Sequence, residues 1–259
     1  MGRHSSKISR VEHGTATPSA ADIRAWCGHC GAKSQTDDLI ASMRAIEGMW
    51  IEWRRMESTG LRRAQESLLP LYERTRQFRA YSSWLMPGMI QTRAYTAAVL
   101  RATRQRRELP DDVDKAVAAR MDRQRLLHSG GRRFAFLVEE SVLRGGVGDV
   151  DVMAAQLGHL ITTASLPNVS IGVVPMRPGR SARPFEDFWI FDEAQVMVEL
   201  VSGFLTVTQP REIAMYVRVF GQLAGLAVYG AAARKRITAA IGALGDDSAA
   251  SGEDVATNL

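Results

Sequence analysis

The spacing of apolar residues divides the chain into a short helical part and a longer part in which helices and strands intermix. The first part begins with a short helix over 5–13. Ser19 is a good N-cap for a second helix over 20–30. Residues 1–32 are therefore predicted to form a small, entirely helical domain.

A third helix opens at Thr36 and carries a heptad-like apolar seam. Its members are Leu39, Met43, Ile46, Trp50 and Trp53. Such a seam can form a dimeric coiled coil or dock onto the rest of its own chain, and its short length favours docking. A further helix over 61–76 contains Pro70, which predicts a kink or a split into two helices.

From residue 77 onward the apolar period alternates between that of strands and that of helices. Strands are predicted at 77–84, 133–138, 169–174, 185–191 and 195–201, the last two joined as a hairpin by Asp192-Glu193-Ala194. Helices are predicted at 91–106, 111–128, 141–143, 150–164, 209–227 and 231–243. The polar, acidic segment 245–259 is predicted to be disordered. The fold class is therefore mixed α and β: a small all-α domain followed by a larger α+β domain over 36–244.

Composition and charge are ordinary for a soluble globular protein. The apolar fraction is 46% and the charged fraction 24%, while a net charge of +5 fits a nucleic-acid partner without establishing one. The polar N-terminus lacks the apolar core of a secretory signal, and no window approaches the roughly eighteen apolar residues of a membrane span. Two cysteines are too few for a disulfide framework. We therefore expect a cytoplasmic protein.

The first predicted helix has the pattern of a DNA-recognition helix. Ile8 and Val11 face inward, Gly14 stops the helix, and Pro18 lies in the turn that follows. The residues expected to donate to base edges and phosphates are Ser5, Ser6, Lys7, Ser9 and Arg10, with further phosphate contacts from Arg3 and Thr15. The competing interpretation is a solvated basic helix face, and the ordered run up to Pro18 favours recognition.

The run from Ser6 to Ser19 resembles the second half of the repressor-like helix-turn-helix domain (XRE, or Cro/C1 type). In that family a scaffold helix and the start of a second helix precede the recognition helix. Here Met1 to His4 stand where the family has the turn between helices two and three. The resemblance thus implies a partial helix-turn-helix. Either the true start codon lies upstream or the gene encodes a reduced DNA-binding domain, and we favour the upstream start.

Residues 36–240 resemble the large DUF5753-type domain that actinobacterial regulators carry after such a helix-turn-helix. The matching residues are Met86 to Thr92 with Tyr95, Arg120 with Arg123-Gln124, Glu140 with Leu143, Gln156-Leu157 with Leu160, Asn168 to Pro175, Phe188 and Glu199. Members are often described as antitoxin-like regulators, encoded near a small DUF397-type protein. The resemblance implies a regulatory domain and no known ligand.

A competing motif is Trp26-Cys27-Gly28-His29-Cys30, which matches the active-site string of protein disulfide isomerases. In that fold the first cysteine caps a helix N-terminus, where the dipole lowers the pKa of the thiol. Here the preceding residues are already helical, so the cysteines fall at a helix C-terminus. We therefore expect Cys27 and Cys30 to be small buried residues, with a redox switch or a thiol–disulfide oxidoreductase as alternatives. Nothing has the ligand spacing of a zinc finger.

The remaining charged motifs do not support an enzyme. Glu139-Glu140 follows a strand, and adjacent carboxylates at a helix start more often interact with its exposed N–H groups than form an acid–base pair. The basic run from Arg177 to Arg183 is suited equally to phosphate binding and to a solvated loop. The chain has no P-loop, dinucleotide fingerprint, GxSxG or HExxH motif. No catalytic residue, cofactor or metal is predicted.

Together these patterns predict a DNA-binding transcriptional regulator that acts on double-stranded DNA. Residues after 36 are expected to form a homodimer and to sense a ligand or a partner, such as a DUF397-type protein. The alternative is an antitoxin-like protein-interaction module without DNA binding.

Overall fold

The computed structural model describes residues 5–40, 43, 50–52, 60–177, 180 and 186–256. The chain separates into two compact units, residues 1–50 and 51–259. The sequence pattern instead starts the second domain at residue 36. The difference arises because Ile40 packs with Ile23 and Cys27 in a small core of its own, which keeps this segment in the first unit.

All the regular secondary structure described in the first unit up to Ile40 is helical. Its elements are α1 (Ser5–Glu12), α2 (Ala20–His29), the 3-10 helix η1 (Lys33–Gln35) and a helical segment at 36–40. The two predicted helices at 5–13 and 20–30 are confirmed. Of the predicted seam, Leu39 is exposed and Met43 packs against the small core. Trp50, predicted to lie in the same helix, instead begins the strand Trp50–Glu52, so the prediction is wrong at this position. Ile46 and Trp53 lie outside the described residues.

The second unit is built on a mixed sheet. Its strands are β1 (Trp50–Glu52), β2 (Gln77–Ser82), β3 (Arg133–Glu139), β4 (Val169–Val174), β5 (Phe188–Phe191), β6 (Gln195–Glu199) and β7 (Gly203–Val207). They lie in the order β1-β7-β6-β5-β2-β3-β4. Strands β2, β3 and β4 are parallel, and β5, β6 and β7 form an antiparallel meander joined to β2 through β5. The carboxyl ends of the three parallel strands therefore share one edge.

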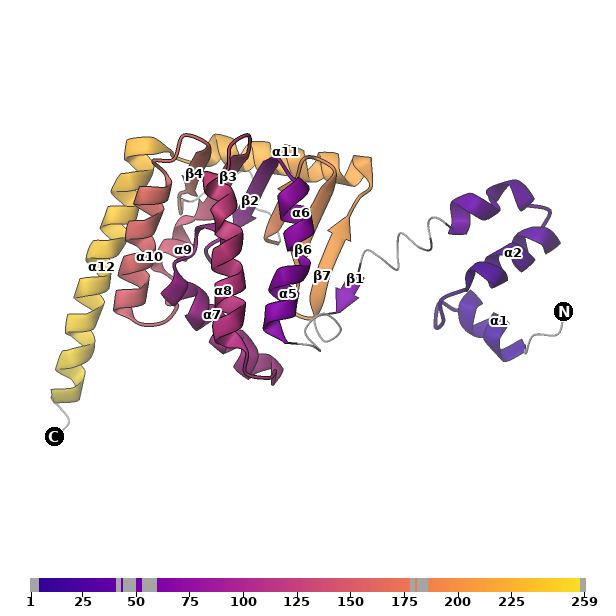
Figure 1. Ribbon diagram of the computed structural model, residues 1–259, viewed down its shortest axis with the longest axis horizontal. Coiled ribbons are helices and arrows are strands. Elements are labelled where there is room, and N and C mark those ends of the chain that lie inside the picture. The colour runs from indigo at the N-terminus through magenta and orange to yellow at the C-terminus, as the bar shows by residue number, and fades with distance from the viewer. Residues whose placement is uncertain are drawn as a thin grey trace. The chain divides into compact units, whose positions relative to one another are not determined.

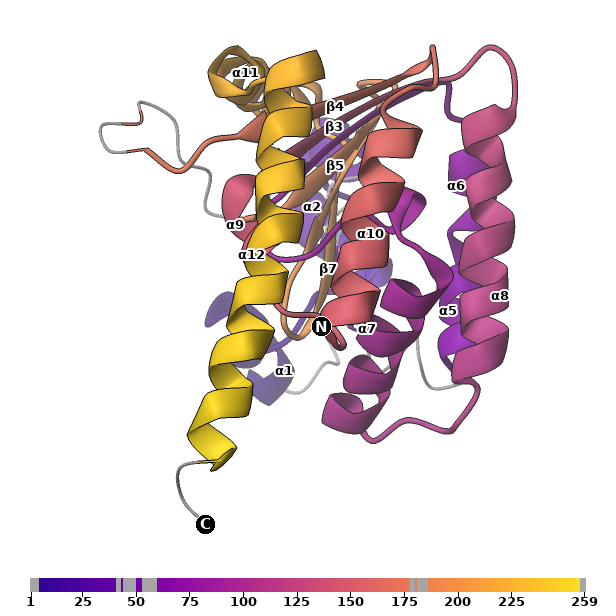
Figure 2. The same ribbon diagram turned by 90° about the vertical axis from the view of Figure 1, so that its left-hand side faces the viewer.

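Helices cover both faces of this sheet. They are α5 (Leu61–Ser67), α6 (Leu69–Arg74), η2 (Gly88–Ile90), α7 (Arg93–Arg107), α8 (Val113–Gln124), η3 (Arg125–His128), α9 (Glu140–Arg144), α10 (Val150–Thr163), α11 (Pro210–Leu226) and α12 (Gly230–Ala256). Figure 1 shows α5 to α8 and α10 in front of the strands, and Figure 2 shows the sheet nearly edge-on with α11 on the opposite side. No helix in the described part of the chain has the length and apolarity to cross a membrane.

Successive side chains of a strand point to opposite faces of the sheet, so each strand contributes to two separate apolar layers. Phe78 of β2 and Phe134 of β3 are register partners whose rings stack with centroids 4.6 Å apart, in the layer beneath α6, α10 and α12. Tyr81 and Leu137 point to the other face, where they pack with Leu223 of α11. Burial on both faces explains the unbroken apolar run over 134–138 of β3.

The mixed α and β fold class predicted from the sequence is confirmed. Pro70 does split the predicted helix into α5 and α6. It lies in the first turn of α6, where a backbone N–H has no partner within the helix, so the N–H that proline lacks is not missed there. The hairpin at Asp192-Glu193 is also confirmed, with both residues at positive φ. Strands β1 and β7 were not predicted. In addition, α12 continues to Ala256, where 245–259 was expected to be disordered.

Candidate functional site

In the first unit, one carboxylate joins the two helices. Asp22 closes a capping box at the start of α2: the Ser19 side chain accepts from the Asp22 N–H at 3.2 Å, and Asp22 Oδ2 accepts from the Ser19 N–H at 2.8 Å. The same Oδ2 lies 2.8 Å from Nζ of Lys7 on α1. The Asp22 carboxylate therefore both begins α2 and holds α1 beside it.

The residues predicted to contact DNA divide into three groups. Ser9 and Arg10 of α1 are exposed, whereas the Lys7 ammonium is bonded to Asp22. Thr15 folds back on the helix end, where its hydroxyl donates to the carbonyl oxygen of Arg10 at 2.9 Å. Ser5 and Ser6 lie in the first turn of α1, and Arg3 lies outside the described residues. Among the described contacts, the exposed Arg10 side chain is thus the one left without a hydrogen bond, whereas the Ser9 hydroxyl lies 3.5 Å from Nδ1 of His13.

The two cysteines have different environments. Cys27 is buried in the small core beside Ile23, as predicted, and both thiols are free. Cys30 is exposed, so its predicted burial is wrong. The reason is that α2 ends at His29, which places Cys30 at the C-cap beyond the buried stripe.

In the second unit, polar side chains from three helices converge on the turn that contains η2. This turn, residues 86–92, runs through the interior, so its amide groups need partners within the protein. Gln124 donates to the carbonyls of Gly88 and Gln91 at 2.9 and 2.8 Å. Gln156 accepts from the Thr92 N–H at 2.7 Å and donates to the carbonyl of Ile90 at 2.8 Å. Two glutamines therefore hold the turn by its backbone.

Two arginines of α8 lie beside this turn. Arg120 donates from Nε to Gln65 Oε1 at 3.0 Å and from Nη1 to Gln91 Oε1 at 2.8 Å. Arg123 is 4% exposed and donates from Nη1 to the Gln65 carbonyl oxygen at 3.2 Å. Its guanidinium carbon lies 4.6 Å from the centre of the Tyr72 ring, a cation–π contact. We call Gln65, Gln91, Arg120 and Arg123 the arginine cluster.

The electrostatics of the arginine cluster disfavour its own charge. Burial and the neighbouring Arg123 lower the pKa of Arg120 to about 10, and the field of Glu199 opposes this shift. Burial also lowers the pKa of Arg123, against the field of Tyr72. Because arginine side chains stay protonated in proteins, the cluster holds two positive charges at a cost in desolvation.

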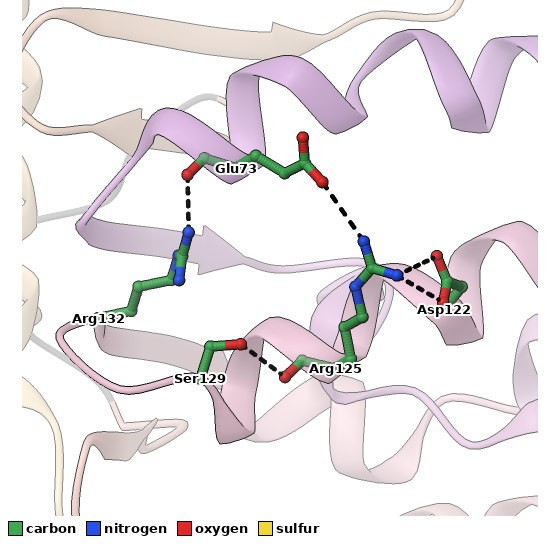
Figure 3. Close-up of polar contacts among 5 residues, drawn as sticks. All are labelled: Glu73, Asp122, Arg125, Ser129 and Arg132. Atoms are coloured by element: carbon green, nitrogen blue, oxygen red, sulfur yellow. Dashed lines mark hydrogen bonds and ion pairs between the residues drawn. The ribbon is translucent and has the colours of Figure 1, made fainter.

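A nearby arginine has a different arrangement. Figure 3 shows Arg125, at the start of η3, donating to both carboxylate oxygens of Asp122 at 3.0 and 3.1 Å and to Glu73 at 3.3 Å. Its neighbour Arg132 donates to the Glu73 carbonyl oxygen at 2.7 Å. The exposed arginine at the end of α8 is thus paired with two carboxylates, whereas the arginine cluster uses neutral amide oxygens.

A second charged group lies at the carboxyl edge of the parallel strands. Glu139, at the end of β3, makes a two-bond ion pair with Arg180, each N–O distance being 2.7 Å, and accepts from the Tyr81 hydroxyl at 2.7 Å. Glu140 accepts from the Met176 N–H and from Arg236. The prediction that these glutamates interact with the N–H groups of the following helix is therefore wrong, because basic and amide groups from distant segments reach them first.

Within the basic run 177–183, the structure describes Arg177 and Arg180. Arg180 is committed to Glu139, which argues against a freely solvated side chain at this position. Arg183 lies outside the described residues.

Comparison with known proteins identifies the second unit. The family model "Domain of unknown function (DUF5753)" matches residues 65–239, more than half of the chain. The chain belongs to the DUF5753 family. No curated protein matches.

Two solved structures are similar to the chain at a low level. One is a phospholipase D family member, Nuc from Salmonella typhimurium, with 9% identity and a TM-score of 0.37; the alignment covers 64% of this chain and 90% of that one. The other is TrmBL2, an archaeal chromatin protein whose title describes a novel mode of DNA binding, with 12% identity and a TM-score of 0.37, covering 81% of this chain and 69% of that one. Likeness at this level carries no functional argument.

The arginine cluster lies within the DUF5753 match, and sequence reasoning did not identify it as a site. Gln91, Arg120 and Arg123 were noted as parts of a family resemblance, without a reason for their chemistry. Gln65 gave no signal of its own. The signal that was present is the occurrence of two arginines one helical turn apart on a face otherwise apolar, at Ala116 and Val117.

Proposed function

We propose that the chain is a DNA-binding transcriptional regulator, in which the first unit contacts double-stranded DNA and the DUF5753 domain mediates dimerisation and senses a ligand or a partner protein. The observation that carries the proposal is the pairing of α1 with α2. The bond from Lys7 to Asp22 fixes α1 on its neighbour and leaves Ser9 and Arg10 exposed. A helix held in this way can enter a major groove without losing its own packing.

The ends of α1 support the same proposal. Gly14 adopts a positive φ of 68°, and the N–H groups of Thr15 and Ala16 both donate to the carbonyl of Arg10. The helix end is therefore closed by contacts to the Arg10 carbonyl, which leaves the exposed Arg10 side chain available to a partner. An exposed arginine next to a serine offers several donors to base edges and phosphates. The family resemblance of this segment to repressor-like domains points the same way.

The test is a fluorescence-anisotropy titration of the full chain against labelled DNA from its own upstream region, at two salt concentrations. We expect binding that weakens with salt, because phosphate contacts release counterions. Arg10→Ala is expected to weaken binding at least tenfold, the size of a lost bidentate base contact. Arg101→Ala is the matched control, since Arg101 is an exposed helical arginine of the DUF5753 domain.

Two results would contradict the proposal. Equal losses in Arg10→Ala and Arg101→Ala would show that any binding is a general effect of net charge. Absence of binding by the wild-type chain would favour an antitoxin-like module that binds a protein partner. Sedimentation of the full chain checks the dimer separately, and a single species of monomer mass would contradict it.

A further inference from the structure

In the part of the chain that the structure describes, the arginine cluster is not bonded to a carboxylate. Arg120 and Arg123 direct all their described hydrogen bonds to the amide and carbonyl oxygens of Gln65 and Gln91. Gln65 Oε1 is shared between them, at 3.0 Å from Arg120 Nε and 3.4 Å from Arg123 Nη2. Among the described residues, no carboxylate forms an ion pair with either guanidinium. Two adjacent cations therefore share acceptors that carry no charge.

Burial makes this arrangement costly. Arg123 is 4% exposed, and its Nε is buried with no hydrogen-bond partner. An unpaired buried donor on a charged group costs more than one on a neutral group. Glu199 acts on Arg120 through its field, but it is an exposed residue at the end of β6. The two guanidiniums thus present donors that the described protein groups leave unsatisfied.

Other arginines of the same domain form ion pairs with carboxylates. Arg125, Arg180 and Arg236 each have a carboxylate within 3.3 Å, whether exposed or buried. Arg132 is an intermediate case, since it donates to a backbone carbonyl and its Nε is buried without a partner. The arginine cluster differs in that two such guanidiniums share one neutral acceptor, Gln65 Oε1.

We propose that Arg120 and Arg123 bind the oxyanion group, phosphate or carboxylate, of a small molecule next to the η2 turn. Guanidinium groups bind such oxyanions with two parallel hydrogen bonds, and a negative charge would offset the mutual repulsion of the pair. Arg120 is partly exposed, and none of the described contacts engages its Nη2, so this nitrogen can donate to an anion.

This inference rests on the proposed function in one respect: it names the class of ligand that the DUF5753 domain would sense. Binding is therefore measured on the full chain without DNA, so that failure of this site and failure of DNA binding are separate results. The probes are inorganic phosphate and succinate, titrated by calorimetry and by thermal melts at matched ionic strength against chloride. Phosphate binding alone identifies a phosphate-bearing ligand, and succinate binding alone identifies a carboxylate.

The decisive variant is Gln65→Glu. It is nearly isosteric and places a carboxylate oxygen where Gln65 Oε1 now contacts both arginines. We expect this variant to have a higher Tm than the wild type in chloride and to bind the anion at least tenfold more weakly, because the site then holds its own counter-charge. Gln222→Glu, at an exposed position of α11, is the matched control and should behave as the wild type.

Three results would overturn the proposal. The first is a wild-type chain that binds neither phosphate nor succinate. The second is Gln65→Glu binding the anion as tightly as the wild type. The third is an equal loss in Gln222→Glu, which would show a general effect of added negative charge. Arg120→Gln provides an independent check, since it removes the partly exposed guanidinium and should also abolish binding.

Discussion

Lys7 and Asp22 face each other across the two helices of the first unit, with Lys7 Nζ 2.8 Å from Asp22 Oδ2. The Asp22 side chain is 8% exposed and that of Lys7 43%. Because the same carboxylate caps α2 through Ser19, the start of one helix and the placement of the other depend on a single group. Lys7, expected from the sequence to face DNA, is therefore engaged in a bond within the unit.

Removing this carboxylate should loosen both helices. Asp22→Ala loses the bonds to Lys7 and to the Ser19 N–H, and loss of a helix cap costs about 1 kcal/mol. We expect amide hydrogen exchange in α1 and in the first turn of α2 to speed up roughly fivefold. Asp38→Ala, at an exposed position, should leave exchange unchanged. Equal protection in Asp22→Ala and the wild type would contradict the structural role of the carboxylate.

Gly172 lies on strand β4, and neighbouring side chains pack directly against its backbone. A Cβ at this position would stand 2.7 Å from Tyr229 Cε1 and 2.8 Å from Leu137 Cδ2, both nearer than real contacts allow. Gly172→Ala should therefore lower the free energy of unfolding by about 1–3 kcal/mol, as overpacking usually does. Gly158→Ala on α10 meets no atom within 4 Å and should instead stabilise by up to about 1 kcal/mol. Urea denaturation of both variants checks the opposite signs, and equal effects would contradict the packing.

The sequence predicted the ends of helices well where a single residue determines where the helix begins. Pro70 marks the boundary between α5 and α6, and Ser19 caps α2, because each acts through its own backbone or side chain. Strand β7 was missed for a local reason as well. The turn before it carries Val201, which is 94% exposed, so an apolar residue stands where a polar turn was expected.

The arginine cluster could not be predicted because it depends on distant contacts. Gln65, Gln91 and Arg120 come from three separate segments, and only the packing of α5 and η2 against α8 brings them together. The sheet order is another example. Nothing in the apolar period of β5 indicates that it pairs antiparallel with β2 while β3 pairs with β2 in parallel. Likewise, the partner of Glu139 is Arg180, forty-one residues later in the chain.

Stability should depend on pH through His159. Burial lowers the pKa of this imidazole below its ordinary 6.5, so the folded state binds fewer protons than the unfolded state. Stability therefore rises with pH between the lowered native pKa and 6.5, and is lost as the pH falls through that window. His159→Gln should remove this part of the pH dependence, whereas His128→Gln, at an exposed position, should retain it. Urea denaturation at about pH 5.5 and pH 7.5 measures the difference, and parallel curves for the wild type and His159→Gln would contradict the prediction.

The ion pair of Glu139 and Arg180 should be strongly coupled. Their side chains are 7% and 11% exposed, and the guanidinium meets both carboxylate oxygens at 2.7 Å. Removing one partner leaves a buried charge, so Arg180→Ala should cost about 3 kcal/mol or more, and adding Glu139→Gln should recover part of that loss. A double-mutant cycle by urea denaturation gives the coupling energy.

The exposed pair of Arg62 and Glu66, whose side chains are 53% and 44% exposed, is the control for this cycle. Its coupling should be no more than about 0.5 kcal/mol, because solvent screens both charges. Salt should reduce the coupling of the exposed pair and leave that of Glu139 and Arg180 nearly unchanged. If both cycles gave the same small value, Arg180 would not be held on Glu139 in solution, and the carboxyl edge of the sheet would present a free carboxylate.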